Sequence, residues 1–263
     1  MTMFYSLGDS ETEQARLIRQ IALYGDTSSI EFGAGDRVCE LGCGSGANLW
    51  IARQAVKGDY VGVDRREAQI RAAEARAGEL ELGNTTFVLA DAGDTGLEGK
   101  SFDAVFCRCV LIHQPDPVPI MREAHRLLRT GGRAVFIEPE GLNHYCAPGK
   151  ANLMKVFHAR TDLAYGEGRG TPDVARKLYP LLVNEGFSSV VLRPHVIHAT
   201  GDDPDRCAAF LRHWLEIIAP VAEILLEQGR ISAEELRLAE AEAMDVSREL
   251  FICHTMWQAE ARK

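Results

Sequence analysis

Five short runs of apolar and β-branched residues alternate with amphipathic segments between positions 37 and 139. The apolar runs occupy residues 37–41, 59–64, 85–91, 102–110 and 133–139. Three segments between them, residues 48–56, 67–77 and 118–128, carry apolar residues at the i, i+3, i+4 spacing of a helix. Continuous apolar strands that alternate with helices are typical of a parallel sheet buried on both faces. The pattern therefore predicts an α/β fold.

A helix is predicted before the first strand. Ser10 and Glu13 have the spacing of a capping box that opens a helix through Tyr24. Leu17 and Tyr24 belong to its apolar stripe. We expect this helix to lie over the carboxyl edge of the sheet, with residues 1–30 as a lid.

The pattern changes after the fifth run. Residues 139–170 are rich in glycine and proline, which favours a lid or substrate segment over a strand. A helix is expected next, from position 171 to about 186. Residues 188–199 and 249–259 predict a sixth and a seventh strand, and residues 203–245 predict a helical pair between them.

Length and composition bound the class of protein. The chain has 263 residues, of which 46% are hydrophobic, so it can bury a core, and we expect one domain in three parts: 1–30, 31–139 and 140–263. Its formal charge of -9 disfavours nucleic acid and anionic lipid as partners. There is no apolar run of 18 residues and no signal-peptide pattern at the N-terminus. We expect a soluble, cytoplasmic protein that is not bound to a membrane and acts on a small molecule.

Seven cysteines occur without a CxxC pair. Structural zinc sites usually need paired thiolates two to four residues apart, so we expect no metal and mostly reduced, structural thiols. A reactive or metalloid-binding pair at Cys107 and Cys109 is the alternative.

A glycine-rich loop carries most of the chemical information. The first strand ends in Gly42, Gly44 and Gly46, where a ligand would have to approach the backbone closely. Asp64 ends the second strand, and a carboxylate there can accept both hydroxyls of a ribose. These features predict a nucleoside-type cofactor without identifying it.

Three further features separate the candidate cofactors. Glu40 stands two residues before the first glycine, where it would repel a pyrophosphate and attract a cationic amino-acid portion. Asp91 ends the third strand and can accept from an adenine amino group. After the fourth strand, residues 108–117 pass from an apolar run into a polar loop at the sheet edge.

These motifs resemble those of a known family. The segments ELGCGSG, VGVD, LADA, FDAVFCRCVLIHQPDP and LLRTGGRAVFIEP are similar, in order and spacing, to the motifs of class I S-adenosylmethionine-dependent methyltransferases. The N-terminal pattern around Tyr5 and Gln20 resembles small-molecule members of the quinone-methylating type. The resemblance implies a Rossmann-like sheet of seven mostly parallel strands, the last antiparallel. The helical pair between the last two strands departs from the bare fold.

The resemblance also implies a set of cofactor-binding residues. The methionine portion would lie on the glycine loop, the ribose on the second strand's end and the adenine between the second and third. The implied residues are Tyr5, Gln20, Glu40, Gly42, Cys43, Gly44, Gly46, Asp64, Arg65, Asp91, Ala92, Arg108, Cys109 and His113.

Methyl transfer from a sulfonium is an in-line displacement, so the enzyme has to hold a nucleophile opposite the methyl group and remove its proton. His113 and His144 are the predicted catalytic residues, with Tyr145 as a further candidate base. Glu138 would either bind substrate or cap a loop.

Other histidines carry a weaker signal. His195 and His198 have no partners at metal-ligand spacing, so we expect no metal there. The helical stripe at residues 210–221, which contains His213 and Trp214, would be core or a homodimer face.

The sequence predicts a methyltransferase that acts on a small organic molecule, with oxygen favoured as the acceptor and nitrogen or carbon next. Three alternatives stay open. The chain could bind S-adenosylmethionine in a non-methylating or regulatory role, or it could be an NAD-dependent oxidoreductase on the same loop. It could also methylate a metalloid through the thiols of Cys107, Cys109 and Cys146.

Overall fold

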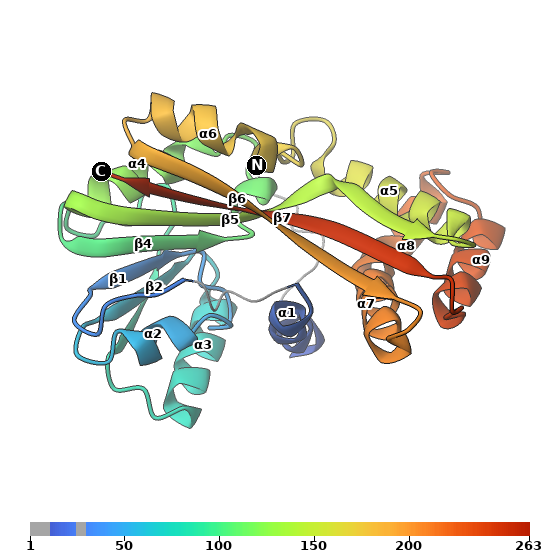
Figure 1. Cartoon of the computed structure of the whole chain (residues 1–263), viewed down its shortest axis with the longest axis horizontal. Helices are drawn as coiled ribbons and strands as arrows, with labels where there is room; N and C mark the ends of the chain where they lie inside the picture. Colours follow the sequence, from blue (N-terminus) through green and yellow to red (C-terminus); the bar gives the residue numbers. More distant parts are fainter. Residues whose placement is uncertain (1–10, 25–29) are drawn as a thin grey trace.

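A single seven-stranded sheet organises the chain in the computed structural model, which describes residues 11–24 and 30–263 (Figure 1). The strand order is β3-β2-β1-β4-β5-β7-β6. Neighbouring strands from β1 to β5 pair in parallel, whereas β7 runs antiparallel to both β5 and β6. The strands are β1 (Val38–Leu41), β2 (Tyr60–Asp64), β3 (Thr85–Leu89), β4 (Phe102–Arg108), β5 (Leu128–Ala147), β6 (Ser188–Thr200) and β7 (Phe251–Arg262). The predicted fold class is confirmed.

Helices cover both faces of the first five strands because successive strand residues point to opposite faces. In β4, Phe106 packs in the same cluster as residues of α2 and α3, whereas Cys107 packs with residues of α4 and α6. These helices are α2 (Trp50–Gln54), α3 (Glu67–Glu79), α4 (Val118–Leu127) and α6 (Val174–Asn184). We call β1–β4, residues 128–139 of β5 and these four helices the core half.

The segment after position 139 differs from the prediction. β5 continues to Ala147, and its far end pairs with β7 after a register shift between Pro139 and His144. The helix α5 (Ala151–Tyr165) follows, with Leu153, Val156 and Phe157 buried on one face. The glycine- and proline-rich composition did not predict the end of β5 or α5. The pairing of β5 with β7 is a long-range contact, which local composition does not determine.

The far ends of β5, β6 and β7 carry a second group of helices (Figure 1). The predicted helical pair is confirmed, and the second helix has the capping box formed by Ser232 and Glu235. The elements are α7 (Pro204–Ile218), the 3₁₀ turn η2 (Ala219–Val221), α8 (Ala222–Glu227) and α9 (Ala233–Met244). We call α1 (Glu11–Tyr24), α5, α7, α8, α9 and the strand ends that they cover the cap half.

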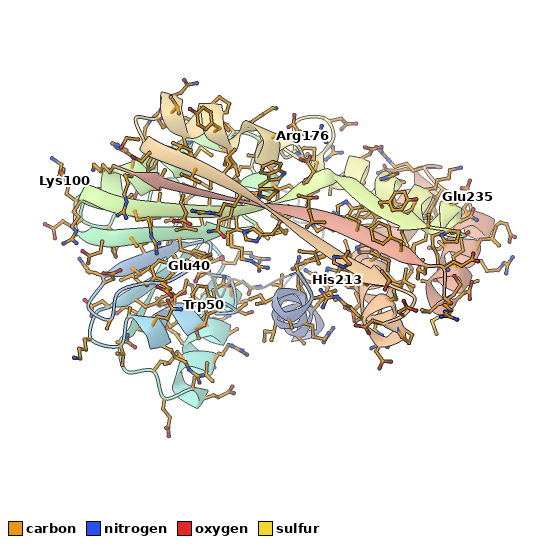
Figure 2. All side chains as sticks on the ribbon, viewed as in Figure 1. Glu40, Trp50, Lys100, Arg176, His213 and Glu235 are labelled. Atoms are coloured by element: carbon orange, nitrogen blue, oxygen red, sulfur yellow. The ribbon has the colours of Figure 1, made fainter. Side chains whose placement is uncertain are left out.

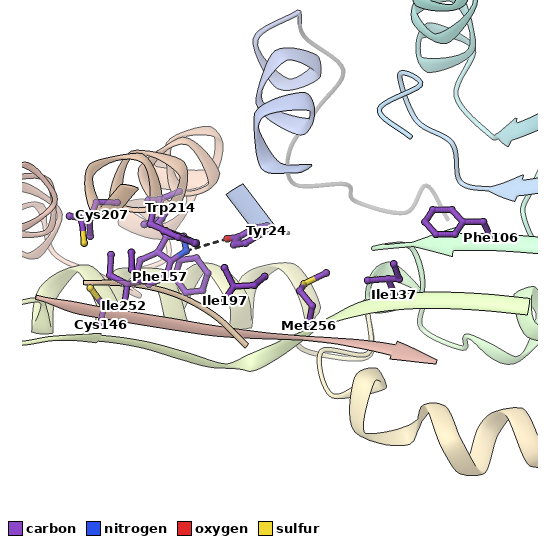
Figure 3. Packing of buried hydrophobic residues seen from close by; sticks show 14 of the residues in the cluster. Tyr24, Phe106, Ile137, Cys146, Phe157, Ile197, Cys207, Trp214, Ile252 and Met256 are labelled. Atoms are coloured by element: carbon purple, nitrogen blue, oxygen red, sulfur yellow. Dashed lines mark hydrogen bonds between the residues drawn. The ribbon is translucent and has the colours of Figure 1, made fainter. Parts of the chain in front are cut away.

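Aromatic packing joins α1 to the rest of the cap half. Trp214 on α7 is fully buried and its Nε1 donates to the hydroxyl of Tyr24 at 3.3 Å (Figure 3). Phe157 of α5 stacks beside Trp214, with ring centroids 5.4 Å apart. The predicted stripe at residues 210–221 is therefore part of the core of the cap half. No helix in the described ranges is long and apolar enough to cross a bilayer.

Candidate active site

The glycine loop follows β1 and owes its sequence to backbone geometry. Gly42 and Gly46 both have a φ of +77°, a region that residues with a Cβ rarely adopt. A Cβ at Gly42 would also lie 2.4 Å from Cγ2 of Val110. At Gly44, by contrast, a Cβ would meet nothing closer than 3.9 Å. Gly44 also has a positive φ, of +52°, so conformation favours glycine at all three positions, and only at Gly44 does the loop leave open space that a ligand could approach.

Glu40 is on β1 (Figure 2), and it is not among the residues that line the cavity bordered by this loop. Its carboxylate is fully buried and accepts hydrogen bonds from Tyr60 and, at 2.7 Å, from Nδ2 of Asn48. Burial raises the pKa of Glu40 to about 7, although both donors lower it. The direct contact of Glu40 with a cationic ligand stays a prediction; in the structure Glu40 orients Asn48, which lines the cavity.

Asp64 ends β2 beside the loop. Its Oδ2 accepts from the amide of Gly44 and its Oδ1 accepts from the amide of Arg66, each at 3.0 Å. A carboxylate has further lone pairs, so Asp64 can still accept from two ribose hydroxyls. Asp91 lies at the end of the neighbouring strand and accepts from the amide of Gly93 at 2.8 Å.

The two carboxylates border one hollow, which we call the glycine-loop cavity. It brings together eleven of the fourteen predicted cofactor-binding residues: Gln20, Gly42, Cys43, Gly44, Asp64, Arg65, Asp91, Ala92, Arg108, Cys109 and His113. Glu40 and Gly46 lie behind the lining, and Tyr5 lies outside the described residues. Glu40 and Gly46 were predicted because they lie within the glycine motif. The conformation of the turn decides that they face away from the cavity.

Three polar atoms beside the glycine-loop cavity lack a hydrogen bond within the described part of the chain. Oγ of Ser45, Oδ1 of Asn48 and Nε of Arg108 are buried and have no hydrogen-bond partner among the described residues. Buried polar atoms in native proteins are nearly always paired, so orphaned atoms around a hollow indicate a polar ligand. The hydrogen-bond donors and acceptors around this cavity suit a nucleoside with an attached amino acid.

Glu138 fixes the segment that closes the cavity on the far side. Its carboxylate accepts from the amides of Val110, Leu111 and Ile112 at 2.9, 2.8 and 3.2 Å. Burial raises its pKa to about 7 in spite of these bonds. Of the two roles considered for Glu138, the geometry supports the loop cap.

His113 stands between the glycine-loop cavity and a second one. It ends the short 3₁₀ helix η1 (Leu111–His113), and its ring centroid lies 5.5 Å from that of Tyr165. Burial, followed by the charge of Arg160, lowers the pKa of His113 to about 3. The ring is therefore neutral at physiological pH.

The second cavity, which we call the histidine cavity, lies between α1, α5 and the sheet. Gln20, Cys109 and His113 border both cavities, so they adjoin. The histidine cavity is lined by Arg16, Leu17, Gln20, Tyr24, Cys109, Ile112, His113, Pro139, Gly141, His144, Phe157, Arg160, Thr161, Tyr165, Ile217 and His254. His144 is thus close to the predicted cofactor site, whereas Tyr145 points away, 53% exposed and packed on Phe251.

Several residues of the histidine cavity were not predicted. Arg16 is buried and forms two 2.6 Å bonds with Glu13 one helical turn away. Arg160 comes from α5, which the glycine-rich composition concealed. His254 meets the site only through the pairing of β7 with β5. The i, i+3 spacing of Glu13 and Arg16 was the one local signal available.

The thiols are separated by the fold. Cys107 points into the sheet core beneath α4 and α6, while Cys109 borders both cavities. Burial raises the pKa of Cys109 to about 11 and that of Cys146 to about 12. Among the described residues no three His, Cys, Asp or Glu side chains form a metal-binding group. Nothing in this arrangement supports metalloid binding by these cysteines.

The parallel sheet with a glycine loop after its first strand, and acidic side chains at the next two strand ends, defines a Rossmann-like nucleoside-binding fold. A family model described as "Methyltransferase domain" matches residues 32–173. The chain therefore belongs to the methyltransferase domain family. Members of this family use S-adenosylmethionine, and the donor set of the glycine-loop cavity fits that molecule.

Two curated relatives illustrate the range of the family. Aklanonic acid methyltransferase DauC from Streptomyces sp. (strain C5) is 35% identical over 107 residues, which cover 40% of this chain and 49% of that protein. Arsenite methyltransferase from Homo sapiens is 30% identical over 110 residues, which cover 38% and 29%. The chain spans about half or less of the length of the curated relatives it matches.

A solved structure shows the same fold. Phosphoethanolamine N-methyltransferase 2 of Haemonchus contortus, in complex with phosphomonomethylethanolamine and S-adenosylhomocysteine, superposes with a TM-score of 0.56 and 17% identity. The match covers 88% of this chain and 49% of that one. At this identity the likeness concerns the fold alone.

Proposed function

We propose that this protein transfers a methyl group from S-adenosylmethionine to a small organic acceptor in the histidine cavity, with oxygen as the acceptor atom. The observation that carries the proposal is the adjacency of two cavities of different chemistry. One holds carboxylates and orphaned polar atoms on a glycine loop, and the other holds neutral histidines.

When bound, S-adenosylmethionine supplies an electrophilic methyl group on a cationic sulfur. Asp64 would accept from its ribose hydroxyls, and Asp91 from its adenine amino group. Oδ1 of Asn48, oriented by Glu40, would accept from its ammonium group. These contacts would hold the cofactor beside the wall that both cavities share.

On the acceptor side, His113 and His144 would hold the hydroxyl proton. Both histidines are neutral because burial lowers their pKa values. A neutral imidazole within reach of the hydroxyl can accept its hydrogen bond and, in the transition state, its proton. Enclosure between α1, α5 and the sheet would keep water away from the methyl group.

Calorimetry with S-adenosylhomocysteine tests the binding step. Wild type should bind, and Asp64→Ala should bind about 100-fold more weakly, because two hydrogen bonds to a charged group are lost. Asp59→Ala is the matched control, since Asp59 lies before the opposite end of the same strand and outside the cavity. Absence of binding to wild type, or equal binding to both variants, would refute the proposal.

Label transfer tests the chemistry. With tritiated S-adenosylmethionine and an extract, the label should enter small molecules. Binding without any transfer would instead support a non-methylating role for the same site, and label in protein or RNA would change the acceptor class.

A further inference from the structure

Charge in the histidine cavity constrains what can bind there. Arg16 and Arg160 both line it and both are at least 96% buried, whereas none of its described lining residues is Asp or Glu. Glu13 compensates Arg16 from outside the lining. A buried ammonium group needs a carboxylate partner, because otherwise no interaction compensates for the hydration that it loses. The cavity is thus unsuited to a cationic acceptor.

Two histidines form a stacked pair in this cavity. His144 on β5 lies directly opposite His254 on β7 in the strand register. Their ring centroids are 4.3 Å apart and their planes differ by 19°. Phe157, 4.6 Å from His144, and Trp214, at 5.9 Å, close around the same ring. The ring of His144 is therefore held in one orientation by packing from three elements.

One nitrogen of that ring is available. Nδ1 of His144 is buried and has no hydrogen-bond partner in the described part of the chain. In the tautomer that carries the proton on Nε2, Nδ1 is an acceptor only. Burial, and then the neighbouring His254, lower the pKa of His144 well below 6.5. A hydroxyl group is the ligand that complements a buried neutral acceptor nitrogen.

We propose that the acceptor is a neutral or anionic hydroxyl compound that donates to Nδ1 of His144, that His254 positions this ring, and that the site rejects protonated amines. This inference rests on the proposed methyl transfer. The hydroxyl oxygen bonds to the methyl carbon as the carbon–sulfur bond breaks. The electron pair of that bond stays on sulfur, and the hydroxyl proton passes to Nδ1.

Positive charge acts on both partners of this proton transfer. The side chains that face His144 come from α1, α5, α7, η1 and β7. Their titratable and charged members are Arg16, Tyr24, His113, His158, Arg160, His213 and His254. Arg160 disfavours protonation of His113, His144 and His213 alike. The same potential lowers the pKa of an acceptor hydroxyl and stabilises the developing oxyanion.

A panel of acceptors tests the charge rule with the whole chain. Phenol, 1-naphthol and 1-hydroxyanthraquinone represent flat hydroxyl compounds, and benzylamine, 1-(aminomethyl)naphthalene and sarcosine represent amines that are protonated at pH 7. With tritiated S-adenosylmethionine, at least one hydroxyl compound should be methylated at least 100 times faster than any amine. Faster transfer to an amine, or no transfer to any hydroxyl compound by a protein that binds S-adenosylhomocysteine, would overturn the inference while leaving cofactor binding intact.

Substitutions test the histidine pair on the hydroxyl compound that is accepted. His144→Asn should lower kcat at least 100-fold and leave S-adenosylhomocysteine affinity within twofold. His198→Asn is the matched control, because His198 is exposed on β6 and lines neither of the two cavities, and it should retain kcat within twofold. Wild-type kcat in His144→Asn would overturn the assignment of the base.

The role of His254 has its own readout. His254→Ala should lower kcat at least tenfold because the stack is lost, and His254→Phe should restore most of it by keeping a ring there. In His254→Phe the acid limb of the kcat profile should move to higher pH, because the neighbour that lowers the pKa of His144 is gone. An unmoved pH profile, or a failure of His254→Phe to improve on His254→Ala, would refute the positioning role.

Discussion

The core half and the cap half differ in the ionisable groups that they bury beside the two cavities. In the core half, Glu40 and Glu138 are fully buried carboxylates whose neighbours donate hydrogen bonds to them. In the cap half, the buried basic groups that line the histidine cavity are arginines and histidines, and Glu13 pairs with Arg16 from outside the lining. Under the proposed function, the carboxylates stabilise segments that face a cationic cofactor, and the histidines line the site where the acceptor loses its proton. The two halves would thus divide the electrostatic work of methyl transfer.

Deleting a large core side chain from each half is expected to give the largest effects. Trp214→Ala and Phe106→Ala should each lower the free energy of unfolding by about 3–5 kcal/mol in urea titrations, since both rings are fully buried. Only Phe106→Ala should also weaken S-adenosylhomocysteine binding in calorimetry, because β4 leads into the glycine-loop cavity. If both variants lost S-adenosylhomocysteine binding equally, cofactor binding would depend on the packing of the cap half as much as on that of the core half.

Acidification from pH 7 to pH 5 should act on the two halves with opposite sign. In the cap half, burial lowers the pKa of His213 to about 3, so unfolding takes up a proton below about pH 6.5, and stability falls by about 2 kcal/mol as the pH is lowered. Burial raises the pKa of Glu40 and Glu138 to about 7, so the native state takes up protons first and gains about 2 kcal/mol for each over the same interval.

Hydrogen exchange followed by mass spectrometry, corrected for intrinsic rates, measures these changes by segment. Protection should fall in α7 at pH 5 and hold or rise in β1. His213→Asn should remove about 2 kcal/mol of the acid sensitivity, and His198→Asn, an exposed residue, should leave it unchanged. A uniform response along the chain would contradict the division into two electrostatic halves.

Two glycines with nearly the same backbone angle separate strain from contact. Gly42→Ala should lower the free energy of unfolding by more than about 2 kcal/mol, because left-handed strain of about 1–2 kcal/mol adds to a 2.4 Å approach to Val110. Gly168→Ala, with a φ of +74° and open space, should cost about 1 kcal/mol. An equal loss of stability in the two variants, measured by thermal unfolding, would show that the glycine loop shifts to accommodate the Cβ of an alanine at position 42.

Surface charge on the cap half should matter least. Arg237 pairs with Glu234 on α9, and both side chains are more than 60% exposed. Arg237→Ala should change stability by less than about 0.5 kcal/mol and leave methyl transfer unaltered. A larger change in the free energy of unfolding, measured by urea titration, would show that Arg237 makes a stabilising contact besides its pair with Glu234.

Local patterns predicted the core half well. The first four strands and the sixth and seventh were found close to their expected positions, because each is a continuous apolar run with its own signal. Asp64 and Asp91 were placed correctly at one sheet edge, since parallel strands bring their carboxyl ends together. The direction of the Glu40 side chain was not predictable, because it depends on Tyr60 of the next strand.

The sequence by itself determined the class of fold, the glycine loop and the cofactor family, since these depend on residue types at fixed local spacing. The tertiary structure alone decided the histidine cavity, which we propose as the acceptor site. β5 runs on through a glycine- and proline-rich stretch only because β7 pairs with it, and that pairing brings His254 against His144 across more than 100 residues of chain. Contacts of this kind arise from long-range packing, which no local pattern encodes.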